Sequence, residues 1–241
     1  MYLCGWYHRE SDETWLADDL SQKRTDADGF MREKPGDWIF IDWAPMDKTG
    51  ALCGEQILYR KALECYHKIC EVIGKQNDGC AEKAEYLRAA IFEKFYDKEK
   101  KVFIDSYECG KRNVTRHSNI LAYLFLECSE EQKKDIYERV ILNEKVAQIT
   151  TPYFKFYENQ VHCQAGNGKL LEESIRNYYG SMLESGATTL YEEYNPEQKG
   201  TEHYAMHGVQ ARFTCWEIIG LGYRIQVLHT ILLMSARCGE I

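Results

Sequence analysis

The sequence predicts an all-α fold made of successive helical hairpins, with short strand insertions. Only four prolines occur in 241 residues. Apolar residues recur at three- and four-residue spacing over several long stretches, and short turn segments, such as Gly-Asn-Gly at 166–168, separate these stretches. Hairpins of this kind can pack as a ring around a pocket. Periodicity alone is equally compatible with a helical bundle or an irregular all-α domain.

The first half of the chain contains two predicted helices and one predicted strand. Residues 57–73 place apolar side chains on one face over about four turns. Residues 81–96 repeat this pattern, with Leu87 and Ile91 among the apolar positions. Residues 101–105 are rich in β-favouring side chains and predict a short strand.

The second half continues the alternation of helix and turn. Residues 118–128 carry another apolar face, and Ser129 predicts the start of the next helix because acidic residues follow this N-cap serine. Residues 151–163 and 170–183 complete the predicted helices. The sequence has no sharp internal period of the kind that defines a solenoid, and no linker rich in proline or serine.

The charge of the chain argues against two classes of partner. The formal net charge is −8, and the sequence has no block of lysine or arginine. Nucleic acids and anionic membrane surfaces need concentrated positive charge, so we expect neither a nucleic-acid nor a membrane partner. The apolar stretch 213–234 is interrupted by charged and polar residues, which makes it a poor membrane span.

The ten cysteines predict reduced thiols rather than a disulfide framework or a zinc site. They are scattered along the chain, and no Cys-x-x-Cys pair occurs. The N-terminus lacks the basic start and apolar run of an export signal. Both observations favour a cytoplasmic protein. Because the sequence begins abruptly with core-like residues, we expect it to be a fragment of a longer domain.

Residues 35–45, Pro-Gly-Asp-Trp-Ile-Phe-Ile-Asp-Trp-Ala-Pro, break the helical rhythm. They place Asp37, Trp38, Asp42 and Trp43 between two prolines. Flat aromatic faces cover the C–H side of a pyranose, and carboxylates accept its hydroxyl hydrogens. One interpretation is therefore a sugar site, and the other is an aromatic-rich turn whose aspartates cap helices.

Residues 185–194, Ser-Gly-Ala-Thr-Thr-Leu-Tyr-Glu-Glu-Tyr, form a second such stretch. If the segment is extended, Glu192 and Glu193 point to opposite faces, so only one of them can face a pocket. Tyr191 and Tyr194 beside them can lower the local solvation of a carboxyl group. The alternative interpretation is a solvated acidic loop after a helix.

These two stretches together resemble landmarks of the bacterial α-L-rhamnosidases, the six-hairpin glycosidases of glycoside hydrolase family 78. The matching elements are Gly-Asp-Trp at 36–38, Phe-Ile-Asp-Trp at 40–43, and Gly-Ala-Thr-Thr at 186–189 followed by Glu192. Their order also agrees with the family. Similarity extends to Ala-Leu-Cys-Gly-Glu-Gln-Ile at 51–57, Arg-His-Ser-Asn-Ile at 116–120 and Glu-His-Tyr-Ala-Met at 202–206.

The resemblance implies an inverting hydrolysis of terminal α-L-rhamnosides. Inversion needs a carboxylic acid that protonates the leaving oxygen and a carboxylate that activates water, with the two carboxyls about 6.5–9.5 Å apart. The family's general base maps onto Glu192. A rhamnose-containing carbohydrate is the implied partner, and the chemistry needs no cofactor or metal. The implied substrate-binding residues are Asp37, Trp38, Asp42, Trp43, His203 and Tyr204.

The sequence also departs from the family pattern. The family's general acid lies upstream, in an acid-rich motif that has no match here, so a missing N-terminal half is an expected partner. We expect residues 1–208 to form a partial (α/α)6 barrel that lacks its first hairpins. Residues 209–241 lose the resemblance and are expected to be an atypical tail, read out of frame. The alternatives are a non-catalytic carbohydrate-binding remnant, another six-hairpin glycosidase or lyase, and an unrelated all-α scaffold.

Overall fold

The computed structural model describes residues 25–32, 41–75, 79–188 and 190–194. The chain divides into two compact units, residues 1–149 and residues 150–241. Within the described ranges, helices make up most of the regular structure and the only sheet is two-stranded. The predicted fold class, all-α with short strand insertions, is therefore confirmed.

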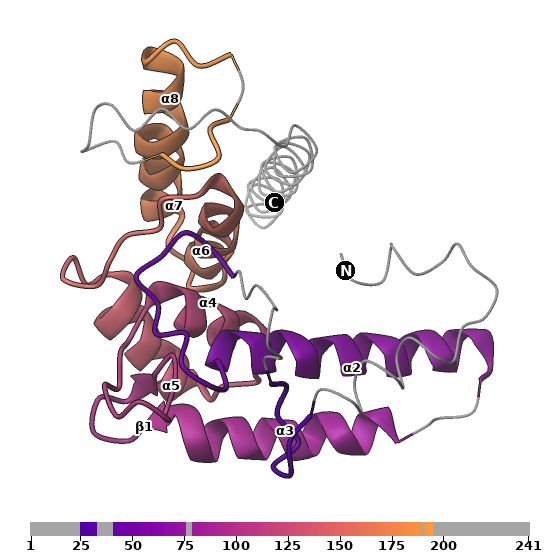
Figure 1. The fold of residues 1–241 in the computed structure, drawn as a ribbon. Coiled ribbons are helices and arrows are strands. Elements are labelled where there is room, and N and C mark those ends of the chain that lie inside the picture. Colours follow the sequence, from indigo (N-terminus) through magenta and orange to yellow (C-terminus); the bar gives the residue numbers. More distant parts are fainter. Residues whose placement is uncertain (1–24, 33–40, 76–78, 189, 195–241) are drawn as a thin grey trace, which may run out of the picture. The chain divides into compact units, whose positions relative to one another are not determined.

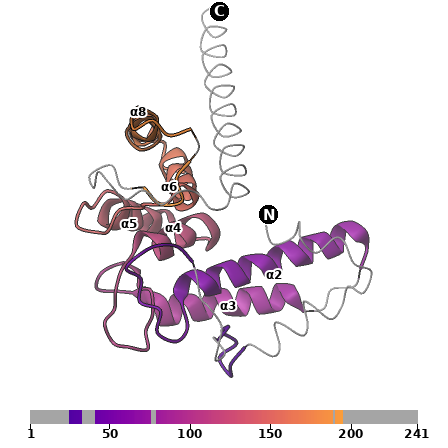
Figure 2. The same cartoon turned by 45° about the horizontal axis from the view of Figure 1, so that its top comes forward.

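The first unit is built on a hairpin of two long helices, α2 (Cys53–Ile73) and α3 (Cys80–Phe95). They lie side by side in both views (Figures 1 and 2). Helix α2 ends at Gly74, where φ is 68° and the Lys75 N–H donates to the Cys70 carbonyl at 2.9 Å. A left-handed residue at this position is the usual role of a C-terminal glycine. The buried face of α3 has the predicted helical spacing: Cys80, Ala84, Leu87, Ile91 and Phe95.

A two-stranded hairpin connects α3 to the helix that follows. Strand β1 (Tyr96–Asp97) pairs antiparallel with β2 (Val102–Phe103), so the predicted strand is present over two of its five residues. Asn119, on helix α4 (Arg116–Phe125), fixes β2 from the side. Its amide donates to the Phe103 carbonyl and accepts from the Phe103 N–H, both at 2.9 Å.

Helix α4 packs against α2, and eight consecutive residues of α4, from Arg116 to Tyr123, are buried. The buried Arg60 of α2 binds the C-terminal end of α4, where its Nη1 donates to the Phe125 carbonyl at 2.7 Å. Its Nη2 pairs with Glu127 at 2.7 Å. A cation at a helix C-terminus satisfies a free carbonyl and interacts favourably with the helix dipole.

Helix α5 (Glu130–Ile136) begins at the predicted N-cap. Ser129 accepts the Gln132 N–H at 3.2 Å, while the Gln132 side chain accepts the Ser129 N–H at 2.9 Å, which completes a capping box. The helix continues into a π-helical turn, η1 (Tyr137–Ile141).

The second unit contains helix α6 (Pro152–Gln164) and a continuous helical segment made of α7 (Gly168–Ile175), the π turn η2 (Arg176–Gly180) and α8 (Ser181–Glu184). Thr151 caps α6 by accepting the Phe154 N–H at 3.3 Å, and Pro152 occupies the first turn, where its missing N–H costs nothing. None of the helices in the described ranges is long and apolar enough to cross a membrane.

Candidate functional site

Asp42 is one of the predicted sugar-binding residues, and it lies buried in the first unit. Its carboxylate is 2.7 Å from Nε2 of His117, and both side chains are only 3% exposed. His117 belongs to the first turn of α4, so this pair joins the loop before α2 to a helix 75 residues later. The histidine holds one oxygen of this carboxylate in a defined orientation.

Trp43 follows Asp42 and has the opposite environment, with 45% of its surface exposed. The loop behind it is fixed by the segment that follows β2. The Asn113 amide donates to the Pro45 carbonyl at 3.1 Å, and the Asp47 N–H donates to the Asp105 carboxylate at 3.4 Å. Trp43 is therefore an exposed aromatic side chain on an anchored loop.

Asp105 is the centre of this anchoring. Its carboxylate accepts hydrogen bonds from Thr115 at 2.6 Å, Ser118 at 2.7 Å and Asn113 at 2.6 Å. Burial raises the pKa of Asp105, and these three hydrogen bonds offset only part of that shift. Because Thr115 and Ser118 flank His117 in sequence, Asp105 also fixes the N-terminal turn of α4 that carries the partner of Asp42.

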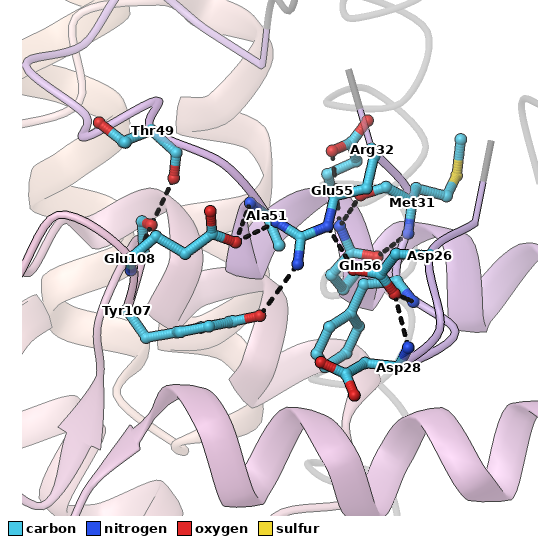
Figure 3. Close-up of polar contacts among 12 residues, drawn as sticks. Asp26, Asp28, Met31, Arg32, Thr49, Ala51, Glu55, Gln56, Tyr107 and Glu108 are labelled. Carbon is cyan, nitrogen blue, oxygen red and sulfur yellow. Dashed lines mark hydrogen bonds and ion pairs between the residues drawn. The ribbon is translucent and has the colours of Figure 1, made fainter. Parts of the chain in front are cut away.

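A second cluster, which we call the Arg32 clasp, consists of Arg32, Asp26, Tyr107, Glu108 and Ala51 (Figure 3). The guanidinium of Arg32 pairs with Asp26 and with Glu108, and donates to the Tyr107 hydroxyl at 3.2 Å. Glu108 also accepts the Ala51 N–H at 3.1 Å. Burial alone would raise the pKa of Glu108, but the bonds from Ala51 and Arg32 outweigh burial and lower it.

The clasp joins the two ends of the stretch that contains the first group of predicted sugar-binding residues. Glu108 binds Arg32 at one end and Ala51 at the other. Next to it, the buried amide of Gln56 accepts the Met31 N–H at 2.8 Å and donates to the Met31 carbonyl at 3.1 Å. These long-range contacts limit how far the ends of the stretch 32–51 can separate.

In the second unit, Gly186 starts the segment that carries Glu192. It has φ of 87°, its N–H donates to the Leu183 carbonyl and the Ala187 N–H donates to the Met182 carbonyl, both at 3.0 Å. This double hydrogen bond is a Schellman motif, which ends α8 and turns the chain away from it. The glycine of the Gly-Ala-Thr-Thr element is therefore explained by its backbone conformation.

Glu192 is half-buried, and the next two residues are tied to the start of the second unit. Glu193 accepts a hydrogen bond from the Thr150 hydroxyl at 3.0 Å, and the Tyr194 N–H donates to the Thr150 carbonyl at 2.6 Å. The ring of Tyr194 lies 5.5 Å from that of Tyr191. In the sequence, Glu192 thus lies between Tyr191 and Tyr194, whose rings contact each other.

The structure describes three of the seven predicted site residues. Asp42 and Trp43 are neighbours in the first unit, and Glu192 belongs to the second unit. The other four lie outside the described residues: Asp37, Trp38, His203 and Tyr204. Two residues that hold the surroundings of the described site residues were not predicted: His117, which contacts Asp42, and Thr150, which bonds Glu193 and Tyr194 next to Glu192. His117 lies in the Arg-His-Ser-Asn-Ile element that resembles the family, which was the available signal, whereas nothing in the sequence marks Thr150.

The family comparison decides the identity of the fold. The family model of the bacterial α-L-rhamnosidase six-hairpin glycosidase domain matches residues 10–214. The chain belongs to this family. No curated protein sequence matches the chain.

Two solved rhamnosidase structures are similar to this six-hairpin glycosidase chain. The family 78 rhamnosidase of Bacillus sp. GL1 shares 25% identity over 76% of the chain, with a TM-score of 0.66. The rhamnosidase of Klebsiella oxytoca, solved with rhamnose bound, shares 21% identity over 83% of the chain, also with a TM-score of 0.66. The chain spans 21% and 39% of these two proteins. Its helical hairpins are thus part of an (α/α)6 barrel.

Proposed function

We propose that this chain contributes to an inverting α-L-rhamnosidase and carries its general base, Glu192. The observation that carries the proposal is the Gly-Ala-Thr-Thr element at 186–189 followed by Glu192, which lies inside the range matched by the family model. The Klebsiella neighbour, which was solved with rhamnose, supports the choice of sugar.

In the proposed reaction, Glu192 removes a proton from a water molecule, which attacks the anomeric carbon of the rhamnoside. The bond between this carbon and the leaving oxygen breaks on the opposite face, and the leaving oxygen takes a proton from a carboxylic acid. The product is rhamnose of inverted anomeric configuration. We assign the role of base to Glu192 and not to Glu193, because Glu193 lies one residue outside the Gly-Ala-Thr-Thr-x-x-Glu motif.

We assign sugar binding to Asp42 and Trp43 in the first unit, together with Asp37, Trp38, His203 and Tyr204. The buried Asp42 keeps its position through His117, so it can accept a sugar hydroxyl without first ordering its side chain. The exposed face of Trp43 can cover the C–H surface of a pyranose ring.

The general acid in this proposal comes from the acid-rich motif of the family's catalytic domain, which has no match in residues 1–241. Losing a general acid lowers the rate by roughly two to four orders of magnitude for substrates whose leaving oxygen must be protonated. A substrate with a strongly acidic phenol does not need that proton. The proposed base can therefore be tested without the acid.

The test measures release of 2,4-dinitrophenol from its α-L-rhamnoside by the purified chain. We expect slow turnover in the wild type, loss of at least about 100-fold in Glu192→Gln, and near wild-type turnover in the matched control Glu193→Gln, whose amide oxygen can still accept the Thr150 hydroxyl. Equal activity of the wild type and Glu192→Gln would reject Glu192 as the base.

The alternative is a chain that binds the sugar and breaks no bond. The exposed Trp43 beside the buried Asp42 favours it, because binding needs neither an acid nor a base. A saturable change of tryptophan fluorescence with free L-rhamnose, in the absence of any dinitrophenol release, would select this alternative over hydrolysis.

Two further assignments accompany the proposed function. We propose a cytoplasmic location, because the seven described cysteines are free thiols, among them the buried Cys53, Cys70, Cys80 and Cys128. We also propose that residues 209–241 are an out-of-frame tail, because the resemblance to the family motifs is lost after residue 208; the family model matches the first six of these residues and none after residue 214. The coding DNA tests the tail: read one base early over residues 205–217, it should encode His-Ala-Trp-Gly-Ala-Ser-Pro-Ile-Tyr-Leu-Leu-Gly, the run that the family usually has here, and any other sequence rejects the idea.

A further inference from the structure

Thr150 makes three hydrogen bonds around the segment that carries Glu192. Its hydroxyl donates to Glu193 at 3.0 Å, and its carbonyl accepts the Tyr194 N–H at 2.6 Å and the Tyr178 hydroxyl at 2.8 Å. A single residue shortly before α6 therefore holds both residues that follow the proposed base. Glu193 lies 43 positions after Thr150 in the sequence, so the contact is tertiary rather than local.

Tyr178, in the π turn η2, is held in place by several contacts. It is 3% exposed, and the ammonium group of Lys155 lies 5.3 Å from the centre of its ring. Lys155 is itself paired with the buried Glu158 at 2.5 Å. The Tyr178 ring also meets the ring of Tyr194 edge to face, with centroids 5.9 Å apart. These contacts fix the ring, and the ring fixes the hydroxyl that reaches Thr150.

The other side of Glu192 is also held. The hydroxyl of Tyr191 lies 3.4 Å from that of Ser185, at the end of α8. Tyr191 then contacts Tyr194, so the residues before and after Glu192 support each other. Glu192 belongs to no helix, and its backbone position therefore depends on these tertiary contacts.

We propose that Thr150 and Tyr178 form a clamp, defined by the three hydrogen bonds of Thr150, that positions Glu192 for its reaction with water. This inference rests on the proposed function. Thr150 and Tyr178 are positioning residues, since neither needs to touch the substrate. A displacement of a reacting group by about 1 Å can lower a rate by roughly 100-fold, so a base on a short irregular segment needs such a clamp.

The test compares two pairs of variants and two measurements in the whole chain. Thr150→Val removes the hydroxyl and keeps the shape, while Thr150→Ser keeps the hydroxyl and is the matched control. Tyr178→Phe removes only the hydroxyl that reaches the Thr150 carbonyl, and the wild type is its control. The first measurement is hydrogen exchange of the Tyr194 amide by NMR, and the second is kcat and KM for 2,4-dinitrophenyl α-L-rhamnoside.

We expect Thr150→Val and Tyr178→Phe to speed exchange of the Tyr194 amide by about tenfold, which is the effect of losing one net hydrogen bond. We expect kcat to fall roughly tenfold to 100-fold while KM changes by less than about twofold, because only the base is displaced. Thr150→Ser should keep both values near those of the wild type. Unchanged exchange at helix α6, in the same unit as Thr150 and Tyr178, would show that this unit remains folded in the variants.

Two results would overturn the inference. Wild-type exchange of the Tyr194 amide in both variants would show that there is no clamp, and faster exchange with unchanged kcat would show that the clamp does not position the base. Failure of the proposed function looks different. The wild type would then release no dinitrophenol, while the exchange of Tyr194 would still report whether Thr150 and Tyr178 hold this segment.

Discussion

Replacing Gly50 with alanine would place a methyl group where the Glu108 carboxylate already lies. Gly50 has φ of 67°, and a Cβ added to its backbone would overlap both carboxylate oxygens of Glu108. The far end of a flexible side chain usually moves aside at little cost. Here it cannot do so freely, because the same carboxylate accepts the Ala51 N–H and pairs with Arg32.

The expected loss of stability has two parts. A left-handed conformation costs an alanine roughly 1–2 kcal/mol relative to glycine. Hydrogen bonds to a charged group contribute about 1.5–3 kcal/mol, but the side chains of Arg32 and Glu108 are 29% and 31% exposed. Solvent screening therefore reduces this second part to about 1–2 kcal/mol. The sum is a loss of about 2–4 kcal/mol for Gly50→Ala.

Gly110→Ala is the matched control. Gly110 has φ of 73°, and nothing lies within 4 Å of the position that a Cβ would take there, so only the conformational part applies. Urea unfolding followed by far-UV circular dichroism measures both variants against the wild type. We expect Gly50→Ala to lose about 1–2 kcal/mol more than Gly110→Ala. An equal loss in the two variants would refute the idea that the Arg32 clasp holds Glu108 in place.

Three further predictions concern single side chains. Burial raises the pKa of Asp105, so the stability that this carboxyl contributes is present below its unfolded pKa and is lost as pH rises through its folded pKa. Urea unfolding should therefore show the stability of Asp105→Asn rising relative to the wild type between these two pKa values. A difference that stays constant with pH would contradict this. Ser129→Ala removes the capping box and should cost about 1 kcal/mol in the same assay, whereas no loss would argue against the cap. Burial raises the pKa of Cys128 to about 12, so iodoacetamide should label the exposed Cys163 in the folded chain and label Cys128 only after unfolding.

The helices could be predicted because their signals are local. Apolar spacing located α2 and α3, and the N-cap serine located the start of α5 at the observed residue. The boundaries of the helices were predicted less accurately. The predicted helix 118–128 begins at Arg116 and ends at Phe125, because Thr115 is the N-cap and Glu127 adopts φ of 33°. The predicted helix 170–183 contains a π turn, which leaves no mark in the apolar pattern.

The contacts that hold the site could not be predicted in the same way. Arg32 and Glu108 are 76 residues apart, and each looks like an ordinary solvated charge in the sequence. The amide of Gln56 mimics a backbone partner for Met31, a role that depends on where α2 lies and not on neighbouring residues. Thr150 similarly contacts Glu193 only because the fold brings these residues, 43 positions apart in the sequence, next to each other. Tertiary packing creates these contacts, and sequence patterns record only the residue types.

If Glu192 activates water for an inverting hydrolysis, the configuration of the first product reveals it most directly. Proton NMR can follow the purified chain acting on 2,4-dinitrophenyl α-L-rhamnoside. We expect β-L-rhamnose to appear first and the α anomer to follow only by mutarotation, with no enzymatic product from Glu192→Gln. First appearance of the α anomer, or the same product course from Glu192→Gln, would contradict this role of Glu192.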